Sequence, residues 1–393
     1  MGAADDVSLI DHHCHGILRG DVDAVSFESL LSESFDPPPE GTSNWDRPLG
    51  LAIRRWCAPE LDLEPLSPAD GYLTRRSELG ADEVARRLFA AAGLEALLVD
   101  TGHRAEEILG VEEMADISGT TTREVVRLER VAEAVAASGV DGAGYPEAFE
   151  RELRRAAANA VGLKTIVAYR GGFDFDPARP GHDEVVAAAE TFTKGASESG
   201  RGPRLTDTVL LRFGIWAGID LSAEERLPLQ FHAGYGDPDL RLHLADPARL
   251  EGLMKAATGA GAEFVLLHCY PFHREAAYMA DVYPHVSFDV GWLTHYAGPS
   301  AGRVVAEALE VAPFTSQLYS SDAFGLPEQY LVAAAQFRRA LGSVLDRWIA
   351  DGDCTAPDAD RIVELIAREN ARRLYTRLVS RDQPTIAVSG SSE

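Results

Sequence analysis

The chain has 393 residues, of which 46% are hydrophobic and 25% charged, as in a soluble globular protein with one large barrel-type domain or two ordinary domains. Its net charge of −25 argues against nucleic-acid binding, which needs clustered Lys and Arg. No stretch approaches the roughly 18 consecutive apolar residues that span a bilayer, and the first residues lack the basic and apolar regions of a signal peptide. We therefore expect a cytoplasmic protein that acts on a small molecule and binds neither nucleic acid nor a membrane.

The first informative pattern is the run from Asp11 to Gly16, which contains His12, His13, Cys14 and His15. It follows residues 7–10, an apolar run that predicts a short buried strand. Side chains alternate along a strand, so His13 and His15 share one face and Cys14 points to the other. Two imidazoles that project together can hold a metal ion. A tag remnant or a surface cluster is the alternative, but the mixed sequence after a strand favours a metal site.

The rest of the chain alternates between predicted strands and helices after a long insertion. Residues 19–80 are rich in Pro, Ser and Asp, contain short helical pieces at 24–34 and 49–57, and are expected to cap an active site. Strands are predicted at 94–100, 123–129, 161–168, 227–233, 262–269, 285–290 and 317–322, although 123–129 could also begin a helix. Helices are predicted at 82–92, 145–160, 183–197, 205–219, 246–258, 273–282, 300–311, 327–351 and 358–378.

Eight strands that alternate with helices predict a (β/α)8 TIM barrel over residues 1–378, with a helical insertion after strand one and a flexible polar tail at 379–393. A doubly wound open sheet is the alternative. No GxGxxG sequence follows any predicted strand, which argues against that alternative.

Metal-binding residue types fall at the carboxyl ends of the predicted strands. His13 and His15 end strand one, Lys164 lies in strand four, His232 ends strand five, His268 ends strand six and Asp322 ends strand eight. The carboxyl ends of all barrel strands meet at one rim, where active sites form. Residues more than 300 positions apart are therefore expected to meet in space.

This pattern resembles the metal-dependent amidohydrolase superfamily, as does the closing sequence from Asn370 to Tyr375. Residues 230–238 (QFHAGYGDP) and 267–276 (LHCYPFHREA) are similar to its amidohydrolase 2 branch. Within that branch they resemble the amidohydrolase half of FluG-type proteins, in which this half is joined to a glutamine synthetase-like half. The resemblance covers nearly the whole chain, and we expect no synthetase half in these 393 residues. It implies that His13, His15, His232 and Asp322 are metal ligands, and that His268 binds the metal or polarises the substrate. Asp322 and His268 would be the catalytic residues.

The number of metal ions depends on Lys164. Imidazole and carboxylate ligands suit Zn best, and also Mn or Fe(II). The resemblance implies that a carbamylated Lys164 would bridge two ions. Alternatively, its ammonium group binds a substrate carboxylate or a neighbouring acid such as Glu129, which leaves one ion.

Four further residues are candidate substrate contacts. Arg170 follows strand four and could bind an anion bidentately, although a surface position fits equally well. Tyr235, His273 and Trp292 follow strands five to seven. They could line a pocket or only pack a loop.

The expected reaction is attack of metal-bound hydroxide on an amide, ester or lactone carbonyl of a small molecule. The resemblance suggests a γ-glutamyl amide. A mononuclear-metal decarboxylase or hydratase is the alternative, because fold does not fix the reaction. A non-catalytic metal-binding scaffold is less favoured, and a homo-oligomer is left open.

Overall fold

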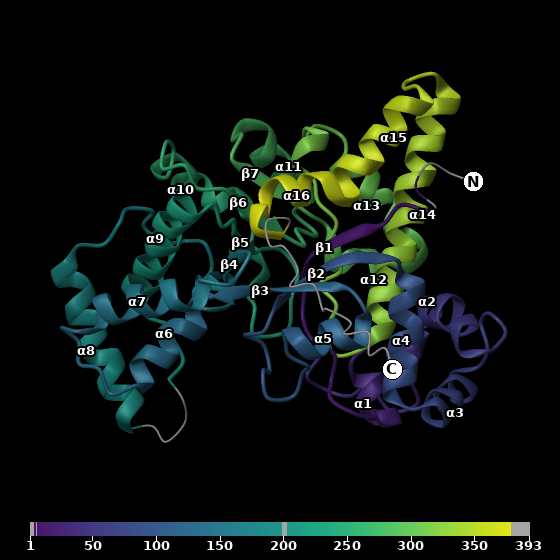
Figure 1. Cartoon of the computed structure of the whole chain (residues 1–393), viewed down its shortest axis with the longest axis horizontal. Helices are drawn as coiled ribbons and strands as arrows, with labels where there is room; N and C mark the ends of the chain where they lie inside the picture. The colour runs from purple at the N-terminus through teal and green to yellow at the C-terminus, as the bar shows by residue number, and fades with distance from the viewer. Residues whose placement is uncertain (1–3, 5, 199–202, 379–393) are drawn as a thin grey trace, which may run out of the picture.

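The computed structural model describes residues 4, 6–198 and 203–378 (Figure 1). Its strands are β1 (Leu9–Cys14), β2 (Leu94–Asp100), β3 (Thr121–Arg127), β4 (Gly162–Thr165), β5 (Leu229–His232), β6 (Phe264–Leu267) and β7 (Val286–Phe288). Its helices are α1 (Ala24–Ser29), α2 (Pro48–Trp56), α3 (Ala69–Leu79), α4 (Ala81–Ala92), α5 (Val111–Ser118), α6 (Leu128–Ala137), α7 (Tyr145–Ala157), α8 (His182–Glu198), α9 (Thr208–Glu225), α10 (Glu251–Ala256), α11 (His273–Val282), α12 (Gly291–Tyr296), α13 (Ala301–Ala308), α14 (Pro327–Asp351), α15 (Ala356–Glu364) and α16 (Asn370–Leu374). None of these helices has the length and apolar character that a membrane crossing requires.

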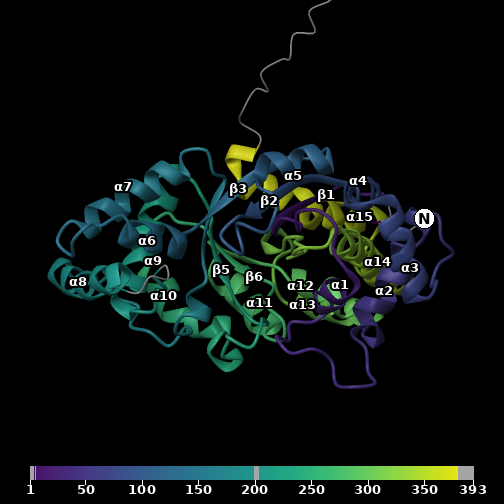
Figure 2. The same ribbon diagram turned by 90° about the horizontal axis from the view of Figure 1, so that it is seen from below.

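The strands β1 to β7 form one parallel sheet in which the spatial order is the order along the chain. Every residue of β1, β5 and β6 is buried, as expected for a parallel sheet covered by helices. In both ribbon views the sheet lies at the centre, with α6–α9 gathered on one side and α1–α4 on the other (Figures 1 and 2). The predicted parallel α/β architecture is confirmed.

Residues 317–325 fill the space between β7 and β1. The N–H of Leu318 donates to the carbonyl of Phe288 at 3.0 Å, which joins this segment to β7. The N–H of Asp322 donates to the carbonyl of His13, also at 3.0 Å, which joins it to β1. The segment therefore takes the place of the predicted eighth strand and closes the barrel, although it forms isolated bridges instead of a continuous ladder.

The insertion at residues 19–80 contains α1, α2 and α3, and it is attached to the barrel by buried polar contacts. Nε of Arg76 in α3 donates to Glu328 of α14 at 2.7 Å, and the Tyr72 hydroxyl donates to the same carboxylate oxygen at 3.0 Å. All three side chains are buried. The position of α3 is therefore fixed against the longest helix.

Several predicted boundaries differ from the structure. The predicted strand 161–168 ends early, because a 3₁₀ turn at Val167–Tyr169 follows β4. The predicted strand 123–129 ends at Arg127, where α6 begins. The predicted helix 358–378 is divided by a π-helical turn at Leu365–Glu369. Helices α3, α5 and α12 were not predicted, and the predicted tail 379–393 lies outside the described residues.

Candidate metal centre

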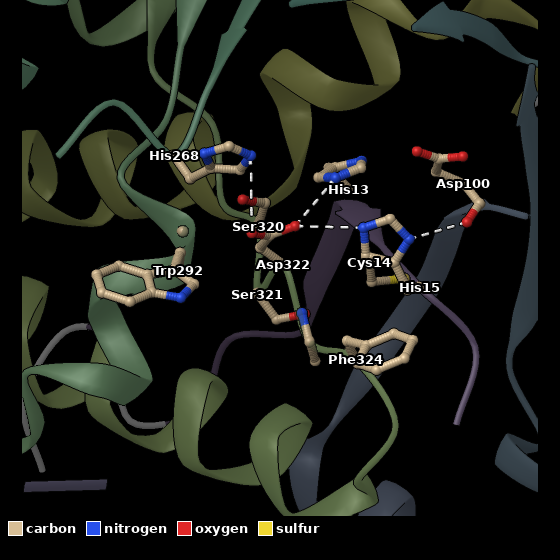
Figure 3. A network of polar contacts seen from close by, with 12 residues as sticks. His13, Cys14, His15, Asp100, His268, Trp292, Ser320, Ser321, Asp322 and Phe324 are labelled. Carbon is tan, nitrogen blue, oxygen red and sulfur yellow. Dashed lines mark hydrogen bonds and ion pairs between the residues drawn. The ribbon is translucent and has the colours of Figure 1, made fainter. Parts of the chain in front are cut away.

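Two histidines and an aspartate converge where β1 ends (Figure 3). Nε2 of His13 lies 3.1 Å from Oδ1 of Asp322, and Nε2 of His15 lies 3.6 Å from the same oxygen. The possible ligand atoms of these three residues all lie within 4.8 Å of one another. Cys14 faces away, with Sγ 3.6 Å from the carbonyl of Leu98. The alternation along β1 thus places the two predicted histidines together.

Two residues of the centre have left-handed backbones. The φ angles are 51° at Asp322 and 38° at His268, values that are uncommon for residues other than glycine. Backbone hydrogen bonds hold both positions: the Asp322 N–H donates to His13, and the His268 N–H donates to Oδ1 of Asp289 at 2.8 Å. Such conformations cluster at functional sites, where the surrounding structure maintains them.

Hydrogen bonds on the outer ring nitrogens orient His15 and His268. Nδ1 of His15 donates to the carbonyl of Asp100, and Nδ1 of His268 donates to the carbonyl of Ala233, both at 2.9 Å. A carbonyl only accepts, so each proton lies on Nδ1 and each Nε2 keeps its lone pair for another partner. This is the arrangement that metal-binding histidines use.

The imidazoles of His13 and His232 are neutral, and in the described structure His232 and His268 each have a ring nitrogen without a hydrogen-bond partner. Burial, together with the nearby Lys164, lowers the pKa of His13 to about 3, and burial lowers the pKa of His232 well below its usual range. Within the described part of the chain, Nε2 of His232 and Nε2 of His268 have no hydrogen-bond partner. Their rings are 4.3 Å apart between centroids. Unpartnered neutral imidazoles beside a carboxylate fit a divalent metal ion.

Lys164 lies in the centre, beside the buried ion pair between Arg127 and Asp100. Its Nζ lies 2.9 Å from Nε2 of His13 and 3.0 Å from Oδ2 of Asp100, an oxygen that Arg127 also contacts at 2.5 Å. The acid that pairs with Lys164 is therefore Asp100. The alternative partner suggested from the sequence, Glu129, is wrong: its carboxylate accepts hydrogen bonds from the residues that follow Lys164.

A cavity of about 350 Å³ adjoins this centre and is suited to a small molecule. Its wall includes His15, His232, Lys164 and Asp322 from the predicted metal set. Two predicted substrate contacts, Arg170 and Trp292, also line it. The structure thus brings the predicted ligands and a possible binding pocket together.

The structure does not bring Tyr235 and His273 into the cavity wall. The Tyr235 ring stacks on Trp292, with centroids 4.1 Å apart. Nε2 of His273 lies 2.8 Å from Glu307, at the start of α11. Neither residue is part of the wall of this cavity, and their role as substrate contacts stays a prediction.

Glu33, in the insertion, is a cavity residue that was not predicted. Its carboxylate accepts a hydrogen bond from Nε1 of Trp292 at 2.8 Å, and burial raises its pKa. Leu30 and Ser32 line the same cavity. No sequence signal distinguishes Glu33 from the other acidic residues of the insertion, because its position depends on the path of an irregular segment.

Asp289 is a second residue that was not predicted, and it holds His268 and His12 in place through hydrogen bonds. Its Oδ1 accepts from the His268 N–H and from the Ser320 hydroxyl, both at 2.8 Å, and its Oδ2 lies 3.0 Å from His12. The other nitrogen of His12 lies 3.0 Å from the Tyr375 hydroxyl. Asp289 falls within the predicted strand 285–290, so its place at the rim was a usable signal.

Comparisons with known proteins agree with this geometry. The sequence profile of the amidohydrolase family matches residues 10–377. The protein fluG of Emericella nidulans is 27% identical over 98% of this chain; the chain spans 47%, about half, of the length of that relative.

Solved structures with the same fold include proteins of different named functions. A Lactobacillus casei protein that carries the provisional name of metal-dependent hydrolase has a TM-score of 0.83 and 29% identity, over 96% of this chain and 98% of its own. A glucuronate isomerase from Caulobacter crescentus has a TM-score of 0.67 and 15% identity, over 97% and 93%. A uronate isomerase from Bacillus halodurans has a TM-score of 0.64 and 14% identity, over 95% and 94%. The two isomerases show likeness of fold alone.

Proposed function

The chain belongs to the amidohydrolase family, and from this premise we propose that it is a metal-dependent hydrolase that cleaves an amide, ester or lactone bond of a small molecule. The observation that carries the proposal is the meeting of His13, His15 and Asp322 within 4.8 Å, beside the unpartnered Nε2 atoms of His232 and His268. Zn is the preferred ion, with Mn or Fe(II) as alternatives. A barrel over residues 1–378, a small-molecule partner and a cytoplasmic location complete the proposal.

Each residue of the centre has a proposed role. His13, His15, His232 and Asp322 would hold one or two divalent ions, which supply a Lewis acid and a water of lowered pKa. The Asp322 carboxylate, itself one of these ligands, would also accept the proton of the attacking water, then pass it to the leaving amine or alkoxide. Nε2 of His268, 3.6 Å from Asp322, would contact either the ion or the substrate carbonyl oxygen.

The finer proposal for the substrate is an amide of a small carboxylic acid, such as a γ-glutamyl amide. The cavity supports this, because cationic side chains and the Glu33 carboxylate both line it. A mononuclear decarboxylase or hydratase is the second candidate. The arginines of the cavity favour it as well, since such an enzyme must also bind a carboxylic acid.

A substrate screen separates these candidates. The purified protein would be incubated with simple esters, lactones, γ-glutamyl amides and small carboxylic acids, with and without a chelator. Hydrolysis that the chelator abolishes and added metal restores is the expected result. Metal-dependent release of CO₂ without hydrolysis would favour the second candidate, and full hydrolysis in the chelator would contradict the metal-dependent proposal.

A further inference from the structure

Arg170 is a buried cation with unused hydrogen-bonding capacity. Its side chain is only 6% exposed, and its Nη2 donates to Oε1 of Glu133 at 2.9 Å. Its Nε and Nη1 are buried and have no hydrogen-bond partner in the part of the chain that the structure describes. Buried donors without acceptors are unfavourable, so native proteins rarely retain them unless a ligand or a water binds there.

Other guanidinium groups crowd the same region. Arg127, Arg130 and Arg204 line the cavity together with Arg170. Burial lowers the pKa of Arg170; the charge of Glu133 opposes this effect, whereas the charges of Arg204 and Arg127 add to it. Arg127 forms an ion pair with Asp100. Arg130 forms no ion pair among the described residues, and the closest approach of Arg204 to Asp239 is 3.5 Å. An anion would relieve the repulsion among these groups.

Glu133 fixes the orientation of Arg170 and leaves part of the guanidinium free. The same oxygen of Glu133 accepts the backbone N–H of Leu205 at 3.0 Å, so two hydrogen bonds, from Arg170 and from Leu205, fix the carboxylate. It binds only Nη2 of Arg170, and the Nε and Nη1 donors stay unpaired. The free donors of a charged guanidinium bind anions such as a carboxylate through charge-assisted hydrogen bonds.

The cavity of about 350 Å³ that contains these arginines also contains His15, His232 and Asp322. We propose that Arg170, assisted by Arg130 and Arg204, binds a carboxylate of the substrate that lies away from the bond being broken. This inference rests on the proposed hydrolase and names its substrate class: small amides or esters that carry a free carboxylate at the distal end of the acyl chain. Inorganic phosphate shares the anionic chemistry and is distinguished by the test below.

The test uses variants that separate binding from stability. Arg170→Gln alone would leave the Glu133 carboxylate buried without its cation, so it is combined with Glu133→Gln, whose amide oxygen can still accept the Leu205 N–H. Glu133→Gln alone retains the guanidinium. Arg170→Lys retains the charge without the planar fork. Arg154→Gln, which removes an exposed arginine paired with Glu224, is the control.

Two chromogenic esters with the same leaving group and acyl length provide the readout: mono-p-nitrophenyl glutarate carries a distal carboxylate, and p-nitrophenyl valerate does not. We expect the metal-loaded wild-type protein to prefer the glutarate ester in kcat/KM by about 10- to 100-fold, the effect of a charge-assisted hydrogen-bonded pair. The double variant should lose this preference and still hydrolyse the valerate. Arg170→Lys and Glu133→Gln should each retain part of the preference, the latter because the guanidinium stays but loses the carboxylate that orients it, and Arg154→Gln should retain it fully. A wild-type protein without preference, or a double variant that keeps it, overturns the inference.

Calorimetric binding of glutarate and of inorganic phosphate gives a second readout that does not need catalysis. Glutarate should bind the metal-loaded wild-type protein and bind the double variant at least about 10-fold more weakly. Tighter binding of phosphate than of glutarate, or equal binding of glutarate to both proteins, overturns the carboxylate subsite. If neither ester is hydrolysed but glutarate binding depends on Arg170, the proposed reaction fails and the subsite stands.

Discussion

Nζ of Lys164 lies 2.9 Å from Nε2 of His13, the nitrogen that also faces Asp322 at 3.1 Å. A single lone pair on that nitrogen cannot accept from an ammonium group and bind a metal ion at the same time. A metal ion on His13 therefore requires Lys164 to turn toward Asp100, 3.0 Å away, or to change chemically. The state of Lys164 and the occupancy of the centre are thus coupled.

We expect the metal-loaded protein to carry a carboxylated Lys164 and two ions per chain. Native mass spectrometry should show the added mass of one carboxyl group together with the metals, and removal of the metals should return the unmodified lysine. Lys164→Met should bind at most one ion. One ion with an unmodified Lys164 in the wild-type protein would contradict the two-metal arrangement and favour the mononuclear candidate.

Metal retention should depend on His13. Its imidazole is fully buried and faces Asp322, so its removal takes away one proposed ligand. His13→Ala should lose most of the metal found by elemental analysis and at least about 100-fold of the activity. His243→Ala is the matched control, because His243 is exposed on a short helical turn. Equal metal content in wild type and His13→Ala would remove His13 from the ligand set.

Much of the centre could be predicted because it follows from the periodicity of strands. The alternation around Cys14 places His13 and His15 on one face, and the ends of parallel strands bring His232 and Asp322 to the same rim. The position of Asp322 holds even though 317–325 is not a continuous strand, since backbone bonds to His13 fix it.

The remaining site residues depend on features that local sequence does not encode. Glu33 reaches the cavity along an irregular path and is held by Trp292, which lies more than 250 residues later. Lys164 pairs with Asp100 instead of Glu129, because the Glu129 carboxylate already accepts a hydrogen bond from the Thr165 hydroxyl at the end of β4. Tertiary packing decides both.

Asp289 should act as a positioning residue for the centre. It accepts the backbone N–H of His268 and the Ser320 hydroxyl, and it binds His12. Asp289→Asn keeps the size but replaces a charged acceptor, so we expect a loss of about 1–3 kcal/mol in the free energy of unfolding and roughly 10- to 100-fold weaker metal binding. Ser320→Ala, which removes one donor, should have a smaller effect on both. Unchanged metal affinity in Asp289→Asn would show that Asp289 supports only the fold.

The insertion should depend for its attachment on the buried contact between Arg76 and Glu328. Arg76→Ala leaves the Glu328 carboxylate buried without its cation, which destabilises folded proteins by about 3–5 kcal/mol. Denaturant unfolding would measure this loss. Arg86→Ala removes an exposed arginine 3.6 Å from Asp82 and should change stability by less than about 1 kcal/mol. Pairing Arg76→Met with Glu328→Gln should recover most of the loss, and failure to recover it would assign the effect to lost packing.

Glu33 should distinguish substrates that carry an ammonium group. Its carboxylate lines the cavity beside Trp292, and Asp237 lines the same cavity, so both acids can attract a cation. For a γ-glutamyl amide we expect Glu33→Gln to lower kcat/KM about 10-fold, whereas glutaryl p-nitroanilide, which lacks the amino group, should be unaffected. Glu40→Gln, an exposed position in the same insertion, is the control.

The pH dependence of this preference has a defined sign. Burial raises the pKa of Glu33, so the carboxylate takes up a proton at a higher pH than an exposed glutamate would. The preference for γ-glutamyl p-nitroanilide over the glutaryl compound should therefore be complete above the raised pKa and decline as the pH falls through it. In Glu33→Gln the ratio of the two kcat/KM values should not change over this range. A decline of equal size in the variant would assign the titration to another group, and an unchanged ratio in the wild type would exclude Glu33 as the site that binds the ammonium group.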